Sequence, residues 1–226
     1  MSIWLDREEA LIGANNIEKI RKAKVAVFGI GGVGSYVTEG LVRAGIENIV
    51  LVDNDIVDVT NINRQLIADT STIGRNKVEV AKERILKINP NANVEIYKDF
   101  YSEENKDKLI KNDYTYIVDA IDSVSSKISL IKKAHKENIK IISAMGMGNK
   151  LDPTMIEVSD ISKTSICPLA RVMRKKLKEE GIYKLKVVYS KEVPIKKDSK
   201  VTTSISFVPS VCGLIMAGEI IREIIK

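Results

Sequence analysis

Short apolar runs rich in Val and Ile recur along the first two thirds of the chain, and a stretch with helical spacing follows most of them. The first run, residues 24–29, predicts a buried strand, and the residues after it predict a helix over 34–44 that Gly45 ends. Further strands are predicted at 48–53, 94–97, 116–120 and 140–144, and further helices at 76–88, 102–110 and 123–136. This alternation is typical of βαβ units with right-handed crossovers, and hence of a parallel sheet.

The pattern changes after the glycine-containing residues 145–148. Residues 155–158 and 186–189 have strand patterns and flank a basic helix predicted over 169–179; a short strand is predicted at 206–208 and a closing helix at 211–225. We therefore predict an α/β fold, a Rossmann-like, mostly parallel sheet with flanking helices, continued by antiparallel strands in the C-terminal part. The chain reads as one domain over 1–226, with a nucleotide-binding part at 1–150 and a sheet-completing part at 151–226.

Composition narrows the class of protein. The chain has 226 residues, of which 44% are hydrophobic and 29% charged, so one domain with a sizeable core is expected. Charges interrupt every apolar stretch before the roughly 18 residues that a membrane span needs, and residues 1–7 do not resemble a signal peptide. We expect a cytoplasmic protein without a membrane role. The two cysteines form no C-x-x-C pair, which argues against structural zinc and against a disulfide framework.

Positive charge is concentrated late in the chain. Residues 161–200 hold twelve basic and four acidic residues, so this segment carries +8 while the rest of the chain carries −2. Such asymmetry favours a polyanionic partner, and a solvated lysine-rich surface is the alternative interpretation. The candidates for contact with a nucleic acid are the basic residues of the predicted helix: Arg171, Arg174, Lys175, Lys176 and Lys178.

A glycine-rich turn joins the first predicted strand to the first predicted helix. Its glycines are Gly29, Gly31, Gly32 and Gly34. Glycines let the backbone approach a phosphate closely, and the helix N-terminus offers free N–H groups to it. Asp53 ends the second predicted strand, where a carboxylate accepts hydrogen bonds from ribose hydroxyls. These features alone fit NAD, FAD, S-adenosylmethionine or ATP.

Charged side chains after the second and fourth strands favour ATP. The loop that contains Asp55, Asn61 and Arg64 leads to Lys77 at a predicted helix start. An Arg and a Lys at the strand ends suit triphosphate chemistry, in which charge builds on the phosphates, although either alone can be a surface charge. Asp122 follows the fourth strand and is the candidate Mg²⁺ ligand, because Mg²⁺ prefers carboxylate and water oxygens beside phosphates.

Taken in order, these motifs resemble the ubiquitin-activating-like (ThiF/MoeB/HesA) superfamily of ATP-dependent adenylyltransferases. The match runs over roughly residues 5–150 and consists of G-x-G-G-x-G, Asp53, Asp55, Asn61, Arg64, Gln65, Lys77 and Asp119-x-x-Asp122. The resemblance implies that Asp53 binds ribose, that Arg64 and Lys77 contact the phosphates, and that Asp122 holds magnesium. It also implies a homodimer in which Arg7 reaches the ATP of the neighbouring subunit.

Within the superfamily, the chain resembles the tRNA threonylcarbamoyladenosine dehydratases over nearly its whole length. The likeness lies in residues 6–13, 28–35, 60–65, 145–153 and 160–170. The sulfur-carrier activators of the superfamily typically have two C-x-x-C pairs, which this chain lacks. The resemblance implies ATP-dependent dehydration, with ring closure, of threonylcarbamoyladenosine beside the anticodon of tRNA. It also implies that the basic segment 161–200 binds tRNA, because tRNA binding depends largely on phosphate contacts.

Alternatives remain at this point. The chain can instead activate the C-terminus of a ubiquitin-like sulfur-carrier protein, or bind a nucleotide without turnover; a nicotinamide dehydrogenase fits least, and a sulfur-transfer partner stays open. Cys167 falls where some superfamily members carry a reactive cysteine, beside a predicted helix start that can lower a thiol pKa. We favour a small apolar role in a loop for Cys167. His135 is expected in solvent and Cys212 in the core.

Overall fold

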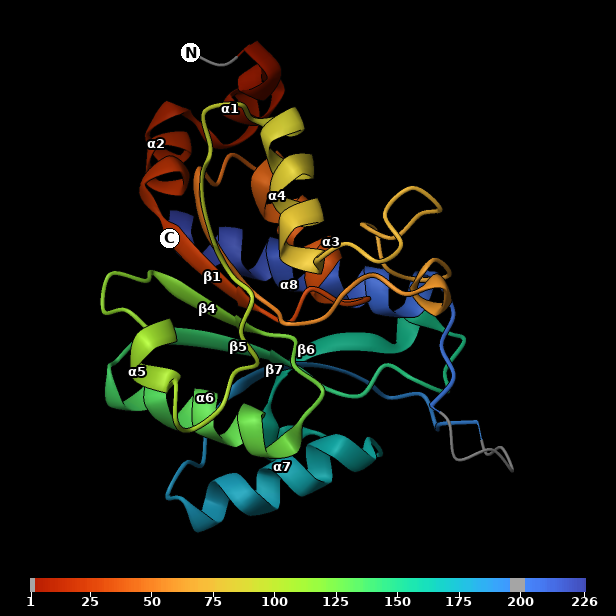
Figure 1. Ribbon diagram of the computed structural model, residues 1–226. Coiled ribbons are helices and arrows are strands. Elements are labelled where there is room, and N and C mark those ends of the chain that lie inside the picture. Colours follow the sequence, from red (N-terminus) through yellow and green to blue (C-terminus); the bar gives the residue numbers. More distant parts are fainter. Residues whose placement is uncertain (1–2, 196–201) are drawn as a thin grey trace.

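The computed structural model describes residues 3–195 and 202–226, which fold around a single sheet (Figure 1). Its strands are Lys24–Phe28 (β1), Asn48–Val52 (β2), Asn93–Tyr97 (β3), Tyr116–Asp119 (β4), Lys140–Ala144 (β5), Ile156–Asp160 (β6) and Lys186–Ser190 (β7). They lie in the order β3-β2-β1-β4-β5-β7-β6. All neighbouring pairs are parallel except β7 and β6. The predicted Rossmann-like sheet with an antiparallel end is therefore confirmed.

Helices cover both faces of this sheet. The α-helices are Asp6–Ile12 (α1), Ala14–Lys22 (α2), Gly34–Arg43 (α3), Lys77–Ile88 (α4), Lys106–Leu109 (α5), Val124–Lys136 (α6), Pro168–Glu179 (α7) and Phe207–Ile225 (α8). Short 3₁₀ turns lie at Ile3–Leu5 (η1), Val59–Asn61 (η2), Pro153–Met155 (η3) and Ile161–Lys163 (η4). Figure 1 shows α2, α3, α4 and α8 on one face and α5, α6 and α7 on the other.

The hydrophobic core forms two layers, one on each face of the sheet. Val25 and Val27 of β1 belong to the layer beneath α3 and α8, while Ala26 and Phe28 belong to the layer beneath α6 and α7. All four side chains are fully buried. A strand buried on both faces needs a continuous apolar run, which explains why β1 lacks the alternation of a surface strand.

Strand order reverses direction at β1. The chain moves outward from β1 through β2 and β3, then returns to place β4 on the other side of β1 and β5 beyond it. The loops after β1 and β4 therefore diverge at the carboxyl edge of the sheet. Such a switch point leaves a crevice between neighbouring strand ends, where ligands bind in open α/β sheets.

Two glycines let α8 cross α3 at short range. A Cβ added to Gly213 of α8 would lie 2.5 Å from the Val33 carbonyl oxygen, directly before α3, and 2.8 Å from the Tyr36 Cβ. A Cβ added to Gly40 of α3 would lie 2.8 Å from the Ala217 Cβ of α8. The helix pair therefore packs backbone against backbone, and α8 supports the start of α3 from behind.

Three parts of the fold differ from what the hydrophobic pattern predicted. The strand predicted at 206–208 is wrong, because α8 begins at Phe207. Pro209 fits in the first turn of this helix, where a backbone N–H has no intrahelical acceptor to lose. No prediction was made for residues 6–22, which form α1 and α2, and the helix predicted at 102–110 shortens to α5. Within the described ranges, no helix is long and apolar enough to cross a membrane.

Candidate active site

The glycine-rich turn lies between β1 and α3 and is held tightly against the turn after β4. Gly29 has a φ of +89°, and a Cβ there would lie 2.5 Å from the Ala120 carbonyl oxygen. A Cβ on Gly34 would lie 1.8 Å from the Gly29 carbonyl oxygen. These two glycines are required by the fold itself, because any side chain would push β1 and β4 apart.

The middle of the turn has a different character, because it borders open space. A Cβ on Gly31 would meet a single atom within 4 Å, the Gln65 Nε2 at 3.9 Å. A Cβ on Gly32 would lie 3.3 Å from both the Arg64 Cγ and the Pro209 Cβ. The backbone N–H groups of residues 31–34 find no acceptor among the residues that the structure describes. Free N–H groups at a helix start, beside an arginine, can bind the phosphates of a nucleotide.

Asp53 links the end of β2 to this turn. Its Oδ2 accepts a hydrogen bond from the Ile30 N–H at 2.6 Å, and its Oδ1 accepts one from the Asp55 N–H at 2.8 Å. Burial raises the pKa of the Asp53 carboxyl, and the nearby Lys77 ammonium and the two hydrogen bonds partly oppose this shift. Each carboxylate oxygen keeps a second lone pair, so Asp53 can still accept ribose hydroxyls.

Lys77 begins α4 and reaches back to the loop after β2. Its side chain is 6% exposed, and its Nζ lies 2.7 Å from the Asp55 Oδ2, which is solvent-exposed. The Lys77 backbone N–H also donates to the Asp55 carbonyl oxygen at 3.0 Å. Asp55 therefore holds the Lys77 ammonium in place, and the ammonium keeps two further N–H donors for a ligand.

The loop around η2 presents Arg64. Asp58 and Asn61 form a reciprocal cap, in which the buried Asn61 amide oxygen accepts from the Asp58 N–H. The Arg64 Nη1 donates to the Thr60 carbonyl oxygen at 2.8 Å and to the Asn63 Oδ1 at 2.9 Å. Asn61 is thus a loop-forming residue, while the half-exposed Arg64 guanidinium retains donors that face away from the loop.

Gln65, which belongs to the family motif but had no predicted role, joins the site. Its side chain is buried, at 6% exposure, and its Oε1 has no hydrogen-bond partner. Its Nε2 faces the open space beside Gly31. Its place in the motif, directly after Arg64, was the signal for it, but a motif position does not distinguish a buried amide from a solvated one. An unpaired buried amide oxygen beside an open cradle is consistent with a polar ligand bound there.

Asp122 lies in the exposed turn after β4, beside the glycine-rich turn. Mg²⁺ bound to a nucleotide usually takes one or two protein carboxylates and completes its coordination with waters and phosphates. A single exposed carboxylate fits this pattern. In residues 3–195 and 202–226 no group of three or more His, Cys, Asp or Glu side chains is arranged to hold a metal ion. A magnesium ion here would therefore take most of its ligands from phosphates and water.

Arg7 does not join this group in the same chain. Leu5, directly before α1, packs against Gly45: a Cβ added to Gly45 would lie 3.3 Å from the Leu5 Cδ1. Gly45 follows the C-terminal end of α3, the end away from the glycine-rich turn. The ten residues of α3 span about 15 Å. Arg7 is exposed and lies on the element at the opposite end of α3 from the glycine-rich turn.

The basic helix α7 separates into two kinds of residue. Arg171, Lys175, Lys176 and Lys178 are exposed, whereas Arg174 is half-buried. The Arg174 Nη1 donates to the Thr164 carbonyl oxygen at 2.9 Å, to the Thr164 Oγ1 at 2.6 Å and to the Ile161 carbonyl oxygen at 3.3 Å. Arg174 therefore anchors the loop before α7. Three other basic residues of the segment, Lys196, Lys197 and Lys200, lie outside the described residues.

Both cysteines are buried, and His135 is exposed, as expected. Cys212 lies in the core of α8, where burial raises the pKa of its thiol to about 12. Cys167 precedes α7 and is 2% exposed. Neither thiol is placed for reaction with a solvent-borne substrate.

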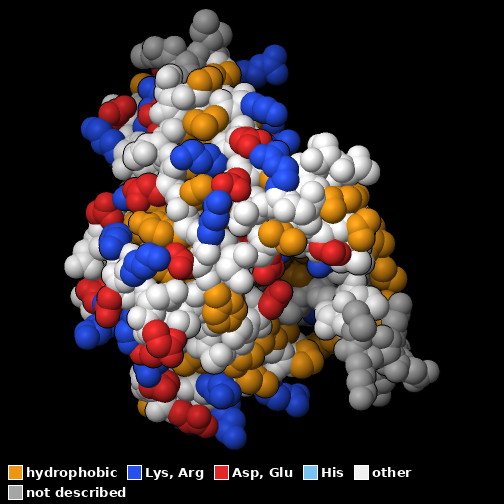
Figure 2. Space-filling view, viewed as in Figure 1, with side chains coloured by type: hydrophobic (Ala, Val, Ile, Leu, Met, Phe, Trp, Pro, Cys, Tyr) orange, Lys and Arg blue, Asp and Glu red, His pale blue; other side chains and the backbone are white. Residues whose placement is uncertain are grey.

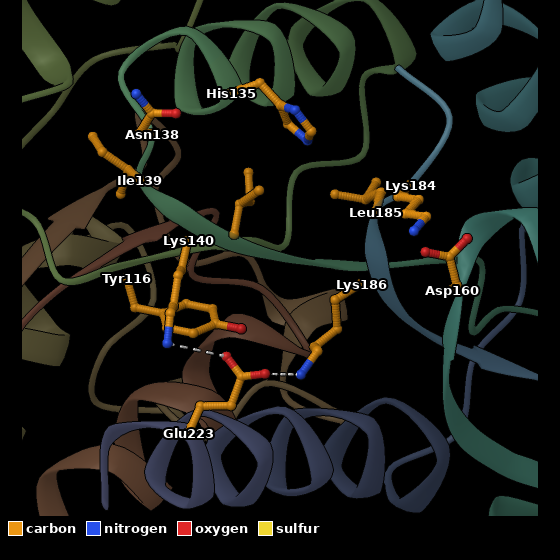
Figure 3. Close-up of a pocket in the computed structure, with 11 residues that line it drawn as sticks. Tyr116, His135, Asn138, Ile139, Lys140, Asp160, Lys184, Leu185, Lys186 and Glu223 are labelled. Atoms are coloured by element: carbon orange, nitrogen blue, oxygen red, sulfur yellow. Dashed lines mark hydrogen bonds and ion pairs between the residues drawn. The ribbon is translucent and has the colours of Figure 1, made fainter. Parts of the chain in front are cut away.

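A cavity of about 380 Å³ opens at the other edge of the sheet, where β4, β5 and β7 begin (Figure 3). Figure 3 shows Glu223 of α8 between Lys140 and Lys186. Its carboxylate pairs with the Lys186 ammonium and lies 3.9 Å from the Lys140 Nζ. These charges satisfy one another within the molecule. The cavity is therefore separate from the candidate site and gives no sign of an unmet ligand.

Comparison with known proteins bears on this arrangement. A model of the ThiF family matches residues 5–226. The tRNA threonylcarbamoyladenosine dehydratase of Bacillus subtilis (strain 168) is 42% identical over 238 residues, covering 97% of this chain and 94% of that protein. The yeast "Adenylyltransferase and sulfurtransferase UBA4" (Saccharomyces cerevisiae) is 34% identical over 149 residues, which is 66% of this chain and 34% of that protein.

Solved structures agree with the sequence match. The crystal structure of E. coli tRNA N6-threonylcarbamoyladenosine dehydratase, TcdA, in complex with AMP has a TM-score of 0.92 and 34% identity, over 99% of this chain and 96% of that one. The complex of the same E. coli protein with ATP has a TM-score of 0.92 and 33% identity over the same shares. Given the family match and a relative similar over nearly its full length, this chain belongs to the ThiF family.

Proposed function

We propose that this chain uses ATP to dehydrate threonylcarbamoyladenosine in tRNA, closing a ring on the modified nucleoside. The observation that carries the proposal is the near-full-length similarity to the B. subtilis dehydratase. The glycine-rich turn, Asp53, Lys77 and Asp122 support it, because they lie at one edge of the sheet and suit a nucleoside triphosphate.

The turn and its neighbours would hold the nucleotide. The free N–H groups of residues 31–34 would donate to phosphate oxygens, and Asp53 would accept the ribose hydroxyls. Gln65 would find a partner for its unpaired Oε1 in a donor group of the ligand or in a bound water. The open space beside Gly31 supports this placement, since it lets a phosphate approach the backbone of the turn closely.

Positive charge would act on the phosphates. The free donors of Arg64 and Lys77 would neutralise the charge that builds on the phosphate chain as a P–O bond breaks. Asp122 would hold Mg²⁺, which would polarise the phosphates and hold them in a reactive geometry. These groups place charge and orient ATP.

The chemistry follows from the substrate. The threonine carboxylate is a poor electrophile, so one of its oxygens first attacks a phosphorus of ATP. Attack on the γ-phosphorus breaks its bond to ADP and gives a mixed anhydride with phosphate; attack on the α-phosphorus expels pyrophosphate and gives one with AMP. A nucleophile of the same nucleoside then attacks the carboxyl carbon and expels that oxygen with the phosphate group. The net change in the nucleoside is the loss of one water. Ring closure within one molecule proceeds at high effective concentration. The enzyme's main task is therefore to hold the threonylcarbamoyl group of the nucleoside in a bent conformation.

A second subunit would complete the site. Arg7 is too far from its own glycine-rich turn, so it would contact the ATP of a partner subunit in a homodimer. Ile56, Val59 and Ile62, in the loop after β2, are 55%, 60% and 38% exposed. Figure 2 shows apolar side chains gathered on that side of the molecule. Such side chains beside a catalytic loop are suited to an interface with another chain.

The two parts of the chain would divide the work. Residues 1–150 would bind ATP, and residues 151–226 would complete the sheet and bind tRNA through the exposed basic residues of α7. The phosphate backbone of tRNA is the polyanion that this surface fits. We propose the cytoplasm as the location of the reaction, because tRNA is available there as a substrate.

Mass spectrometry of nucleosides tests the function. The protein is incubated with ATP, Mg²⁺ and tRNA that carries threonylcarbamoyladenosine, and the modified nucleoside should lose one water. The variants Arg64→Ala and Asp122→Ala should lose turnover by about 100-fold or more while keeping the fold, because they remove charge from the phosphate site. Asp113→Ala is the matched control, since Asp113 is exposed and pairs with Lys24 at the other edge of the sheet. Lack of water loss by protein that binds ATP would refute the proposal.

The alternative function is activation of a ubiquitin-like sulfur-carrier protein, which the partial similarity to yeast UBA4 supports. That activity predicts exchange of pyrophosphate into ATP that depends on a carrier ending in Gly-Gly and ignores tRNA. A sulfur-transfer partner would follow from the same result. Exchange that depends on modified tRNA alone would remove this alternative.

A further inference from the structure

A fully buried ion pair lies beneath the turn that carries Asp122. Asp119 ends β4 and Lys127 belongs to α6; their side chains are 0% and 1% exposed, and the Lys127 Nζ lies 3.0 Å from the Asp119 Oδ2. Removing two charges from water costs several kcal/mol for each ion, and an apolar pair of similar volume often stabilises a fold equally well. Stability alone therefore does not account for charges at this position.

The pair is satisfied by a compact network. The Ser143 Oγ donates to the Asp119 Oδ2 at 2.5 Å, and the Lys127 Nζ donates to the Ser143 Oγ at 3.3 Å and to the Ala144 carbonyl oxygen at 2.8 Å. Ser143 and Ala144 end β5. The network thus ties the carboxyl ends of two neighbouring strands to one helix, without an open polar atom.

The second oxygen of Asp119 points toward the candidate site. The Asp119 Oδ1 accepts a hydrogen bond at 3.2 Å from the Ile121 N–H, one residue before Asp122. The intervening Ala120 forms the floor of the glycine-rich turn, since its carbonyl oxygen lies 2.5 Å from a Cβ on Gly29. One three-residue turn therefore supports both the phosphate cradle and the candidate magnesium ligand.

We propose that Lys127 is a positioning residue for the reaction: through Asp119, its ammonium fixes the turn 120–122, and so holds Asp122 where Mg²⁺ and the phosphates need it. This inference rests on the proposed role of Asp122. Lys127 touches neither ATP nor metal. Removal of the ammonium leaves a buried carboxylate without its counter-charge, and relief of that charge by water or by rotation of Asp119 releases the Ile121 N–H.

The test measures how much Mg²⁺ strengthens ATP binding, by calorimetric titration with and without Mg²⁺. Wild-type protein should show a clear gain in affinity with Mg²⁺, and Asp122→Ala should lose it. In Lys127→Met the ratio of ATP affinity with Mg²⁺ to ATP affinity without it should fall by about tenfold or more, as is typical when a group supporting a metal ligand is removed. The ATP affinity without Mg²⁺ should not change. Lys127→Arg should restore part of the gain, because it returns the charge.

Two further variants separate positioning from folding. Lys127→Met combined with Asp119→Leu replaces both charges with apolar groups, so it should fold as well as wild type yet still lack the Mg²⁺ gain. Lys150→Met is the matched control: Lys150 is also buried, but it donates to the Ser190 carbonyl oxygen at 3.1 Å rather than to Asp119. Its Mg²⁺ gain should stay at the wild-type level.

The outcomes distinguish the inference from the function. A wild-type Mg²⁺ gain in the folded Lys127→Met/Asp119→Leu protein would overturn the role of Lys127. A wild-type gain in Asp122→Ala would overturn the role of Asp122 and the inference with it. Water loss from modified tRNA by wild-type protein would stand in both cases, because that assay does not depend on which residue holds magnesium.

Discussion

The side chains at the candidate site are held by the protein to different degrees. Lys77 is buried and paired with Asp55, and both oxygens of Asp53 already accept backbone hydrogen bonds. Arg64 is tied through one nitrogen, and Asp122 is exposed. Asp53 at the ribose and Lys77 at the phosphates are therefore fixed before ATP arrives, and Arg64 and Asp122 are the side chains that can adjust to the ligand.

Asp53 should make ATP binding sensitive to mild acid. It must be ionised to accept two ribose hydroxyls, and burial raises its pKa above the ordinary aspartate value. As pH falls through this raised pKa, the carboxyl gains a proton and loses an acceptor, so ATP affinity should decline at a higher pH than an exposed aspartate would cause. Titrations of ATP from neutral pH down to about pH 4, near the ordinary aspartate pKa, measure this decline.

Asp53→Asn supplies the reference for that titration. The amide does not titrate, so the variant should bind ATP weakly and show only the pH dependence of ATP itself. The ratio of wild-type to variant affinity then isolates Asp53. A ratio that does not change with pH would show that Asp53 stays ionised or does not contact the ribose.

At the scale of single residues, sequence patterns found the charged side chains that follow strand ends and missed the contacts that depend on packing. Arg64, Lys77 and Asp122 could be named because charged residues after strand ends have a known use. The burial of Gln65 and the ion pair between Asp119 and Lys127 could not be predicted, because the spacing of polar residues does not show which of them are removed from water. That information exists only once β4, β5 and α6 are packed together.

Among the helices, the crossing of α3 and α8 should be sensitive to one methyl group. Gly213→Ala would place a Cβ 2.5 Å from the Val33 carbonyl oxygen, and overpacking of this kind costs about 1–3 kcal/mol of the free energy of unfolding. Because Val33 belongs to the glycine-rich turn, ATP affinity should fall as well. Thermal unfolding and ATP titration measure the two effects.

Gly218→Ala is the control on the same helix. Its Cβ would meet only the Arg222 Nη1, at 3.7 Å, and alanine is favoured over glycine within a helix by about 0.5–1 kcal/mol. It should therefore leave stability unchanged or higher. Equal losses of stability in the two variants would show that the loss does not come from the crossing of α3 and α8.

The exposed face of α7 should contribute to tRNA binding. The double change Lys175→Glu and Lys176→Glu should weaken tRNA affinity and lower the salt dependence of binding by about one to two units of slope, as expected for two lost phosphate contacts. Lys82→Glu with Lys87→Glu on α4, across the sheet, is the matched control. Similar losses from both pairs would indicate an effect of net charge, and no loss from the α7 pair would return these lysines to a solvated surface.

Helices and strands could be predicted where the apolar pattern fits only one type of secondary structure. The five central strands were found because continuous Val- and Ile-rich runs of this length occur in buried parallel strands. Residues 206–208 were assigned to a strand because a short apolar run looks the same at the start of a buried helix. The α7 residues show a further limit: Arg174 shares its neighbours' charge, yet its orientation depends on the loop at Thr164.

For the molecule as a whole, the proposed dimer can be tested by mixing inactive variants. Arg7→Ala and Arg64→Ala homodimers should both lack turnover. After subunit exchange, each mixed dimer would have one site with both arginines, so activity should recover to about a quarter of wild type. Sizing by light scattering should show dimers throughout. No recovery despite verified exchange would place Arg7 outside the partner's site.

The architecture explains why the site could be assembled from the sequence at all. Residues 29–34, Asp53 and Asp122 are distant in the chain, but each follows a parallel strand, and parallel strands bring their carboxyl ends to one edge. Recognition of βαβ units therefore located the site before any contact was known. Sequence patterns do not show how closely the glycine-rich turn packs on Ala120, or that α8 packs behind the start of α3. Both follow from tertiary packing.

The support of α3 by α8 has a consequence for how the protein is made. The glycine-rich turn and α3 leave the ribosome early, but the helix that packs behind them lies at Phe207–Ile225. A nascent chain therefore cannot finish its nucleotide cradle until nearly all of the sequence described here has been translated. During that interval the apolar face of α3 lacks its cover, so a chain stalled before α8 would be a substrate for chaperones or proteases rather than a partly active enzyme.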